Sequence, residues 1–99
     1  MNIQSLIKQA QSMQKNMQSA KTKIDTTIFE GNSELVSIKM NGKRKIIEVK
    51  IKLEDKIEND DIEMLEDMIM IAVNDATSKI EKEINNKLGS QAGMFGDLL

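Results

Sequence analysis

Lysine side chains are the most useful chemical groups in this sequence, which holds thirteen Lys and a single Arg. An ammonium group attracts phosphate as a point charge, whereas reading a base edge favours the forked guanidinium of Arg. Three sets of basic residues, on the first predicted helix, after a predicted turn and on the last predicted helix, are candidates for phosphate contacts: Lys8, Lys15, Lys43, Arg44, Lys45, Lys79, Lys82 and Lys87. Lysines on helices also keep proteins in solution, so composition alone leaves nucleic-acid binding as one of two interpretations.

Catalytic and metal-binding chemistry has little support in the sequence. The chain contains no His, Cys or Tyr, which removes the commonest general base, the thiol nucleophile and the nitrogen ligands of metals. Asp60, Asp61 and Glu63 stand at a predicted helix start, where carboxylates cap the helix more often than they hold a cation. The isolated glycines form no phosphate-binding loop. We predict no enzyme, no catalytic residue, no metal, no cofactor and no small-molecule substrate.

Charge is divided unevenly along the chain, although the net charge is only -2. Residues 1–53 carry ten basic and four acidic side chains, a balance of +6. Residues 54–99 carry four basic and twelve acidic side chains, a balance of -8. Attraction to phosphate is local, because salt screens exposed charges beyond about 8 to 10 Å. The distribution of charge, and not its sum, therefore decides whether a polyanion can bind.

The first predicted helix, residues 3–24, has an apolar seam. Its apolar positions are spaced alternately three and four residues apart, as on a coiled-coil-like face: Ile3, Leu6, Ala10, Met13, Met17, Ala20 and Ile24. These side chains are small or flexible, so we expect weak association unless the rest of the fold supports the helix. A helix of about 22 residues is about 33 Å long, longer than a three-stranded sheet needs for cover, so part of it should project.

Residues 25–53 change to the two-residue period of strands, and Gly31-Asn32-Ser33 predicts a turn after the first strand. The pair Asn41-Gly42 is a strong hairpin signal, because both residues tolerate positive φ. Leu35 and Ile46 break the alternation and mark either a bulge or a contact with a partner. We predict a three-stranded antiparallel meander whose apolar face is formed by Val36, Ile38, Met40, Ile47, Val49, Ile51 and Leu53.

The second predicted helix, residues 61–88, follows the strongest helix-start signal of the chain. Asp60 is placed to be the N-cap, and Glu63 stands where the partner residue of a capping box reaches back. The first four turns carry two apolar stripes, where one would suffice to pack on the chain's own core. The second stripe indicates either a deeply buried monomer helix or a homodimer, whose predicted interface residues are Leu65, Met68, Ile69, Ile71, Ala72 and Val73.

Beyond residue 76 the apolar stripe narrows to one residue per turn, which favours a helix end that leaves the globular body. We expect one domain over residues 1–88 and a flexible tail over residues 89–99, which is rich in glycine. No apolar run approaches the ~18 residues of a membrane span, and the absence of Cys ties the chain to no oxidising compartment. We therefore expect a soluble protein of the cytoplasm without a membrane partner.

Two short motifs lie in the second helix, Glu63-Met64-Leu65-Glu66-Asp67 and Asn74-Asp75-Ala76. The residues of these motifs and their separation resemble the YbaB/EbfC family of small bacterial nucleoid-associated proteins. The basic, Met- and Gln-rich first helix and the strands around the predicted hairpin resemble the same family. The resemblance covers roughly residues 3–88. The chain departs from the family in lacking a Pro before the second helix, which changes a turn. We expect the mid-helix Asn74-Asp75 pair to make a polar contact that fixes packing.

The resemblance implies an α+β subunit of order α-β-β-β-α, with a three-stranded antiparallel sheet and long helices at both ends. It also implies a homodimer in the nucleoid that holds helices out like the arms of tweezers and grips double-stranded DNA. Lysines without Arg forks or aromatic wedges then favour phosphate contacts of low sequence specificity, with an effect on gene expression as a consequence. The alternative is a prefoldin-like or adaptor module without DNA binding, since two helices flanking a hairpin also describe such a module.

Overall fold

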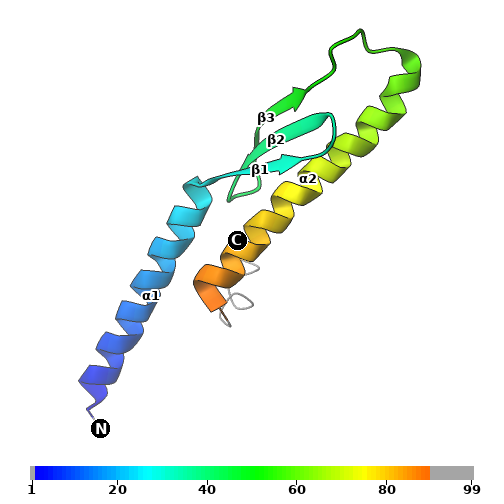
Figure 1. The fold of residues 1–99 in the computed structure, drawn as a ribbon. Coiled ribbons are helices and arrows are strands. Elements are labelled where there is room, and N and C mark those ends of the chain that lie inside the picture. Colours follow the sequence, from blue (N-terminus) through cyan, green and yellow to red (C-terminus); the bar gives the residue numbers. More distant parts are fainter. Residues whose placement is uncertain (1, 90–99) are drawn as a thin grey trace.

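A computed structural model describes residues 2–89 of the chain and confirms the predicted order of elements. Figure 1 shows a long helix, three strands and a second long helix, and the starts of the two helices lie at opposite ends of the molecule. Their bounds are α1 (Ile3–Thr26), β1 (Ile28–Asn32), β2 (Val36–Asn41), β3 (Ile46–Ile51) and α2 (Asn59–Leu88). The radius of gyration is 19.0 Å, whereas a compact chain of 100 residues has about 13 Å. The molecule is therefore elongated.

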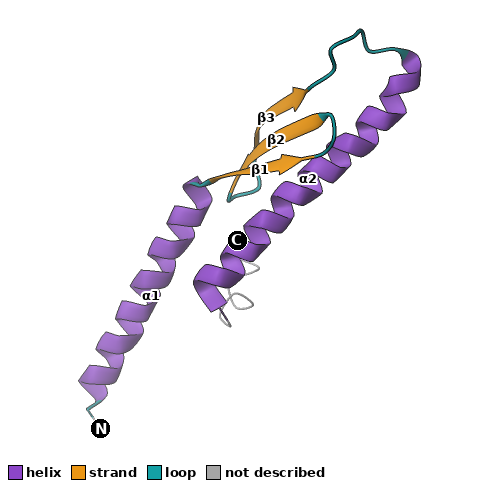
Figure 2. Cartoon of the chain, in the orientation of Figure 1, coloured by secondary structure: helices purple, strands orange, loops and turns teal. Residues whose placement is uncertain are grey.

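The three strands form the predicted antiparallel meander in the order β1-β2-β3, and α2 packs across β1 and β2 (Figure 2). Val36 pairs with Ile51 and Ile38 with Val49, so the apolar side chains of β2 and β3 share one face. The register shifts where Met40 pairs with Ile46, which leaves Ile47 as the extra residue of a bulge. The bulge is one of the two outcomes that the broken alternation predicted.

Gly31 belongs to β1, although the sequence suggested a turn there. A side chain at this position would begin 2.0 Å from the carbonyl oxygen of Ala72 and 2.6 Å from the backbone nitrogen of Ala76. Such distances are far below van der Waals contact, so only glycine lets β1 approach α2 this closely. Small residues therefore meet on both sides of the contact between β1 and α2.

The hairpin between β2 and β3 differs from the two-residue turn that the Asn41-Gly42 pair predicted. Positive φ occurs at Arg44 (φ 66°) and not at Asn41 or Gly42. The Asn41 side-chain oxygen accepts hydrogen bonds from the backbone N–H groups of Lys43 (2.9 Å) and Lys45 (3.1 Å). Asn41 therefore stabilises a longer turn through its side chain, as asparagine does at the first position of many turns.

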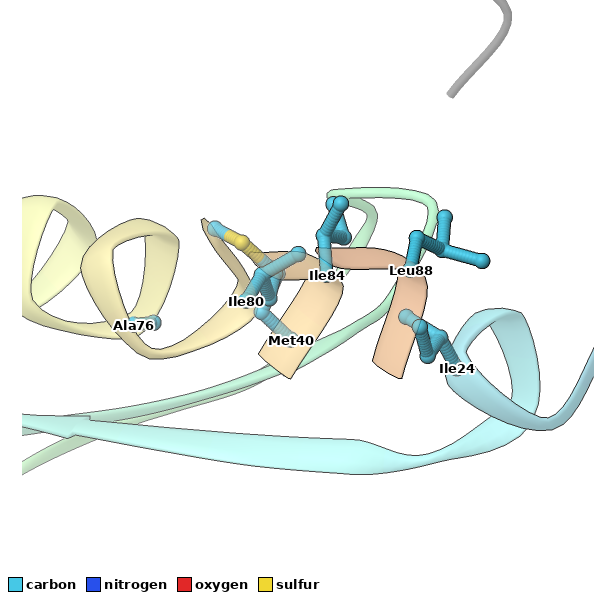
Figure 3. Close-up of a cluster of buried hydrophobic side chains, with 6 residues drawn as sticks. All are labelled: Ile24, Met40, Ala76, Ile80, Ile84 and Leu88. Atoms are coloured by element: carbon cyan, nitrogen blue, oxygen red, sulfur yellow. The ribbon is translucent and has the colours of Figure 1, made fainter. Parts of the chain in front are cut away.

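One apolar cluster joins the two helices to the sheet (Figure 3). Its buried members are Ile24 of α1, Met40 of β2 and four residues of α2: Ala76, Ile80, Ile84 and Leu88. The last turns of α2 do not leave the body of the molecule, contrary to the sequence-based expectation. One apolar residue per turn is enough to bury this part of α2, because α1 and β2 pack against a single face of the helix.

The outer part of α1 projects, as predicted. Only Ile24 is buried in this helix, and Met17 and Ala20 are half-buried against the cluster around it. Farther out the seam is uncovered, with Ile3 71% exposed and Leu6 47% exposed. Asn2 caps the helix, because its side-chain oxygen accepts a hydrogen bond from the backbone N–H of Gln4.

The second helix begins two residues earlier than predicted, at Asn59, and Glu58 is its N-cap in place of Asp60. The side chain of Asp61 reaches back and accepts a hydrogen bond from the Glu58 N–H at 3.0 Å. Four successive acidic or amide residues, at positions 58–61, precede the first apolar position of the helix, so local preference alone does not single out one cap. Of the tail predicted over residues 89–99, all but Gly89 lies outside the described residues.

Candidate nucleic-acid interface

Basic residues line one side of α1 and continue onto the hairpin turn. Lys8 and Lys15 are seven residues apart and so lie on the same side of the helix. Lys15 and Lys23 border one shallow hollow, and Thr22 borders both this hollow and the next one, which Lys43 lines. We call this surface the basic strip, and its residues are Lys8, Lys15, Lys23, Lys43, Arg44 and Lys45.

Gly42 holds the hairpin turn against the end of α1. A side chain at Gly42 would begin 2.0 Å from the carbonyl oxygen of Ile24, so the turn could not approach the helix with any other residue there. The close approach brings the three basic residues that follow Gly42 next to the basic side of α1. The basic residues of the turn are at least twenty positions from those of α1 in the sequence, and this contact helps to join them into one surface.

Arg44 allows stability and charge to be separated experimentally. A left-handed conformation costs a non-glycine residue about 1 to 2 kcal/mol, and Arg44 adopts it at φ 66°. We expect Arg44→Gly to raise the free energy of unfolding by about 1 kcal/mol, measured in urea. The same variant should weaken DNA binding because it removes a charge of the basic strip. A variant that loses both stability and affinity would contradict this assignment.

The three lysines of α2 do not form one surface with the basic strip. Lys79 donates a hydrogen bond to the backbone carbonyl of Glu30 at 2.6 Å and forms an ion pair with Asp75 at 3.5 Å. Lys87 lies 4.0 Å from the carboxylate of Glu83 and borders a different hollow, between α1 and the end of α2. Lys82 is exposed. The structure therefore divides the predicted basic residues into two groups.

Asp75 fastens α2 to the edge strand β1. Its carboxylate accepts a hydrogen bond from the backbone N–H of Asn32 at 2.9 Å. That bond is the main reason why the pKa of the Asp75 carboxyl lies below its ordinary value of 3.8; burial opposes the lowering, and the nearby Lys79 and Lys82 add to it. The Asn74-Asp75 pair was predicted to fix packing by a polar contact, and Asp75 does so.

Replacing Asp75 with Asn should lower stability in a pH-dependent way. The folded-state pKa is depressed, so the carboxylate stabilises the fold above pH 3.8 and this contribution is lost as the pH falls through the lower folded-state pKa. We expect a loss of about 0.5 to 1 kcal/mol at pH 7, because the carboxylate is partly exposed and its ion pair is screened. Urea unfolding at pH 7 and pH 3 measures it, with Asp55→Asn as the control. An equal loss of stability at both pH values would show that the charge of the Asp75 carboxylate does not contribute to stability.

The six residues predicted to form a dimer interface have three different environments. Leu65 and Ala72 are buried within the subunit, in a cluster with Val36 and Ile38 of β2. Met68, Ile69 and Val73 are half-buried at the border of that cluster. Ile71 is 56% exposed. Of the six predicted interface residues, only Met68, Ile69, Ile71 and Val73 therefore reach the surface of one subunit.

The acidic start of α2 lies far from the basic strip. Asp60, Asp61 and Glu63 belong to the first turns of α2, at the opposite end of the molecule from the start of α1 (Figure 1). The longest dimension of the molecule is 70 Å, several times the distance of about 8 to 10 Å over which salt screens exposed charges. The acidic end therefore does not cancel the attraction of the basic strip for a polyanion.

Lys23 is the basic residue that the sequence-based site omitted. It lies eight residues after Lys15, a spacing that keeps it near the same side of a helix, and this spacing was the available signal. Within residues 2–89 no cluster of three or more acidic side chains could hold a metal ion. In the same range no helix is long and apolar enough to cross a membrane.

Comparisons with known proteins agree with this layout. The model of the YbaB/EbfC DNA-binding family matches residues 1–95. A nucleoid-associated protein of Ligilactobacillus salivarius (strain UCC118) is 42% identical over 91 residues, which cover 90% of this chain and 86% of that protein. A nucleoid-associated protein of Legionella pneumophila (strain Corby) is 46% identical over 89 residues, covering 88% and 78%. The crystal structure of an uncharacterized protein from Helicobacter pylori matches with a TM-score of 0.70 and 25% identity, covering 87% of this chain and 91% of that one. The chain therefore belongs to the YbaB/EbfC DNA-binding family.

Proposed function

We propose that this protein binds double-stranded DNA in the nucleoid as a homodimer, through phosphate contacts of low sequence specificity. The observation that carries the proposal is the basic strip, which joins α1 to the hairpin turn and lies at a distance from the acidic start of α2. The relatives named as nucleoid-associated proteins support the same role. The sequence offers no His, Cys or Tyr for catalysis, so we propose a binding protein and not an enzyme.

The composition of the basic strip favours contact with the DNA backbone. Five of its six residues are Lys, which meets a phosphate from many directions but lacks the fork that reads guanine. The side of α1 that carries Lys8, Lys15 and Lys23 holds no aromatic residue that could wedge between bases. Each phosphate that a lysine neutralises contributes about 0.9 to the slope of log affinity against log salt. Six such contacts per subunit give a slope of about -5 for each subunit that engages DNA.

A homodimer would cover apolar surface that one subunit leaves exposed. The helix α2 covers β1 and β2, and in the described residues it makes no contact with β3. Val49 and Ile51 face the same side as the buried Val36 and Ile38, yet they are 48% and 42% exposed. The inner face of β3 is therefore open to a second copy.

The flank of α2 beside β3 extends this apolar surface. Thr77 lies close to Met40 of β2, with its hydroxyl oxygen 3.9 Å from the Met40 sulfur, so this flank of α2 faces away from β1. Val73 and Ile69 lie one and two turns before Thr77 on the same flank, and both are half-buried. Ile71 lies one turn before Asp75, on the flank that faces β1. We propose that β3 and the flank with Ile69 and Val73 form the main dimer surface.

Val49→Asp should dissociate the dimer, because it places a charge in the centre of the proposed surface. We expect the dimer dissociation constant to rise more than about 100-fold, since a charge buried without a partner is strongly unfavourable. Sedimentation velocity over a range of concentrations measures the change. Ile71→Asp on the other flank is the matched variant and should leave most of the dimer intact. A dimer that survives Val49→Asp but not Ile71→Asp would move the interface to the flank that faces β1.

Fluorescence anisotropy of a labelled duplex of about 30 base pairs tests the function itself, with titrations at 50 and 200 mM salt. We expect saturable binding that weakens steeply between the two salt concentrations, and unlabelled random duplex that competes almost as well as the labelled sequence. Absence of binding at 50 mM salt would overturn the proposal. Binding that hardly responds to salt would overturn the phosphate contacts while leaving DNA binding in place.

A further inference from the structure

An apolar groove lies between α1 and the end of α2, on the side of α1 away from the basic strip. Its apolar lining residues are Met13, Met17 and Ala20 of α1 and Leu88 of α2, and its polar lining residues are Gln9, Ser12, Asn16 and Lys87. Its volume is about 520 Å³. The apolar seam of α1 continues beyond the groove to Leu6, which is 47% exposed. This surface belongs neither to the basic strip nor to the proposed dimer surface around β3.

We propose that residues 90–99 of the same chain occupy this groove. The first argument is where the described chain ends. The helix α2 ends at Leu88, which itself lines the groove. Gly89 has a φ of 57°, a conformation that ends the helix and that residues with side chains rarely adopt. The segment therefore starts at the edge of the groove.

The second argument is the length and composition of the segment. Ten extended residues span up to about 33 Å, whereas the part of α1 from Gln9 to Ala20 is only about 17 Å long. The segment therefore reaches all of the groove. Four of its ten residues are large and apolar, among them one of the two phenylalanines of the chain: Met94, Phe95, Leu98 and Leu99.

The third argument is charge. The only charged side chain among residues 90–99 is Asp97, which is acidic. Lys87 lines the groove, and α1 has no acidic residue before Asp25, so the charges at the groove attract Asp97. Occupation of the groove would cover the outer turns of the apolar seam and hold α1 straight where it projects. This inference does not rest on DNA binding, and its test uses no DNA.

Disulfide trapping in the full chain tests the proposal cleanly, because the chain has no Cys of its own. Ser12→Cys with Gly96→Cys places one thiol at the groove and one beside Phe95. Gln18→Cys with Gly96→Cys is the matched pair, because Gln18 borders the hollow on the other side of α1. We expect the first pair to form an intrachain disulfide at least about tenfold faster, as its effective concentration is higher. Adding Phe95→Ala should remove this difference.

Either of two results of the disulfide experiment would overturn the proposal. Equal rates for the two pairs would show that the segment does not prefer the groove. Disulfides mainly between chains, seen on non-reducing gels, would assign the groove to a second copy. A measurement without cysteines checks the same contact, because the ring of Phe95 should shift the methyl signals of Met13 and Met17 in NMR spectra. Methyl signals that are identical in the Phe95→Ala variant would also overturn it.

Discussion

Replacing Lys8, Lys15 and Lys23 with Glu should reduce DNA affinity more than about 100-fold at 100 mM salt, because three phosphate contacts per subunit become repulsions. The salt slope should fall by about 3 for each subunit that engages DNA, at about 0.9 per contact. All three residues are exposed on α1, and both Lys and Glu are good helix formers, so the fold should not change. Anisotropy titrations at several salt concentrations measure both quantities.

Two comparisons make this prediction specific. Lys52 and Lys56 changed to Glu place negative charge in the loop that follows β3, outside the basic strip and the proposed dimer surface, and should weaken binding only slightly. Changing Lys82 and Lys87 to Glu tests the α2 lysines, which were predicted as DNA contacts but lie apart from the basic strip. Lys79 is left out because it holds the backbone of Glu30. If the loss of DNA affinity per changed charge were as large in the α2 variant as in the α1 variant, α2 would be a full part of the DNA interface.

Gly31→Ala should destabilise the fold by about 3 kcal/mol or more, at the upper end of what overpacking costs. The added carbon would lie 2.0 Å from the carbonyl oxygen of Ala72, so α2 would have to move away from β1. The bond from Asn32 to Asp75 and the bond from Lys79 to Glu30 would be stretched by the same movement. For a domain of this size the melting temperature should fall by about 12 °C or more.

Gly89→Ala is the matched glycine control for this prediction. A side chain at Gly89 meets nothing within 4 Å, and its cost comes only from the positive φ of 57°. That cost is about 1 kcal/mol. Calorimetry of the two variants therefore separates a steric requirement for glycine from a conformational one. If Gly31→Ala melted like the Gly89→Ala variant, the close contact between β1 and α2 would not be important for stability.

The sequence alone determined the order of the elements, the antiparallel meander and the projecting first helix. These features follow from local periodicity, since apolar side chains three or four residues apart mark a helix face and alternate residues mark a strand face. The bulge near Ile46 was visible as a break in alternation for the same reason. A polar contact of the Asn74-Asp75 pair was predicted from its position directly after the apolar run of residues 68–73. The family was visible in short motifs of fixed spacing.

Tertiary structure decided the features that depend on contacts between distant residues. Gly31 looked like a turn residue because its partners, Ala72 and Ala76, lie more than forty positions later in the chain. Lys79 looked like a free cation because its acceptor is the backbone of another element, which side-chain chemistry does not reveal. The basic strip formed because Gly42 lets the hairpin turn meet the end of α1. Local sequence reports what a residue prefers, whereas the fold selects which of its possible partners it meets.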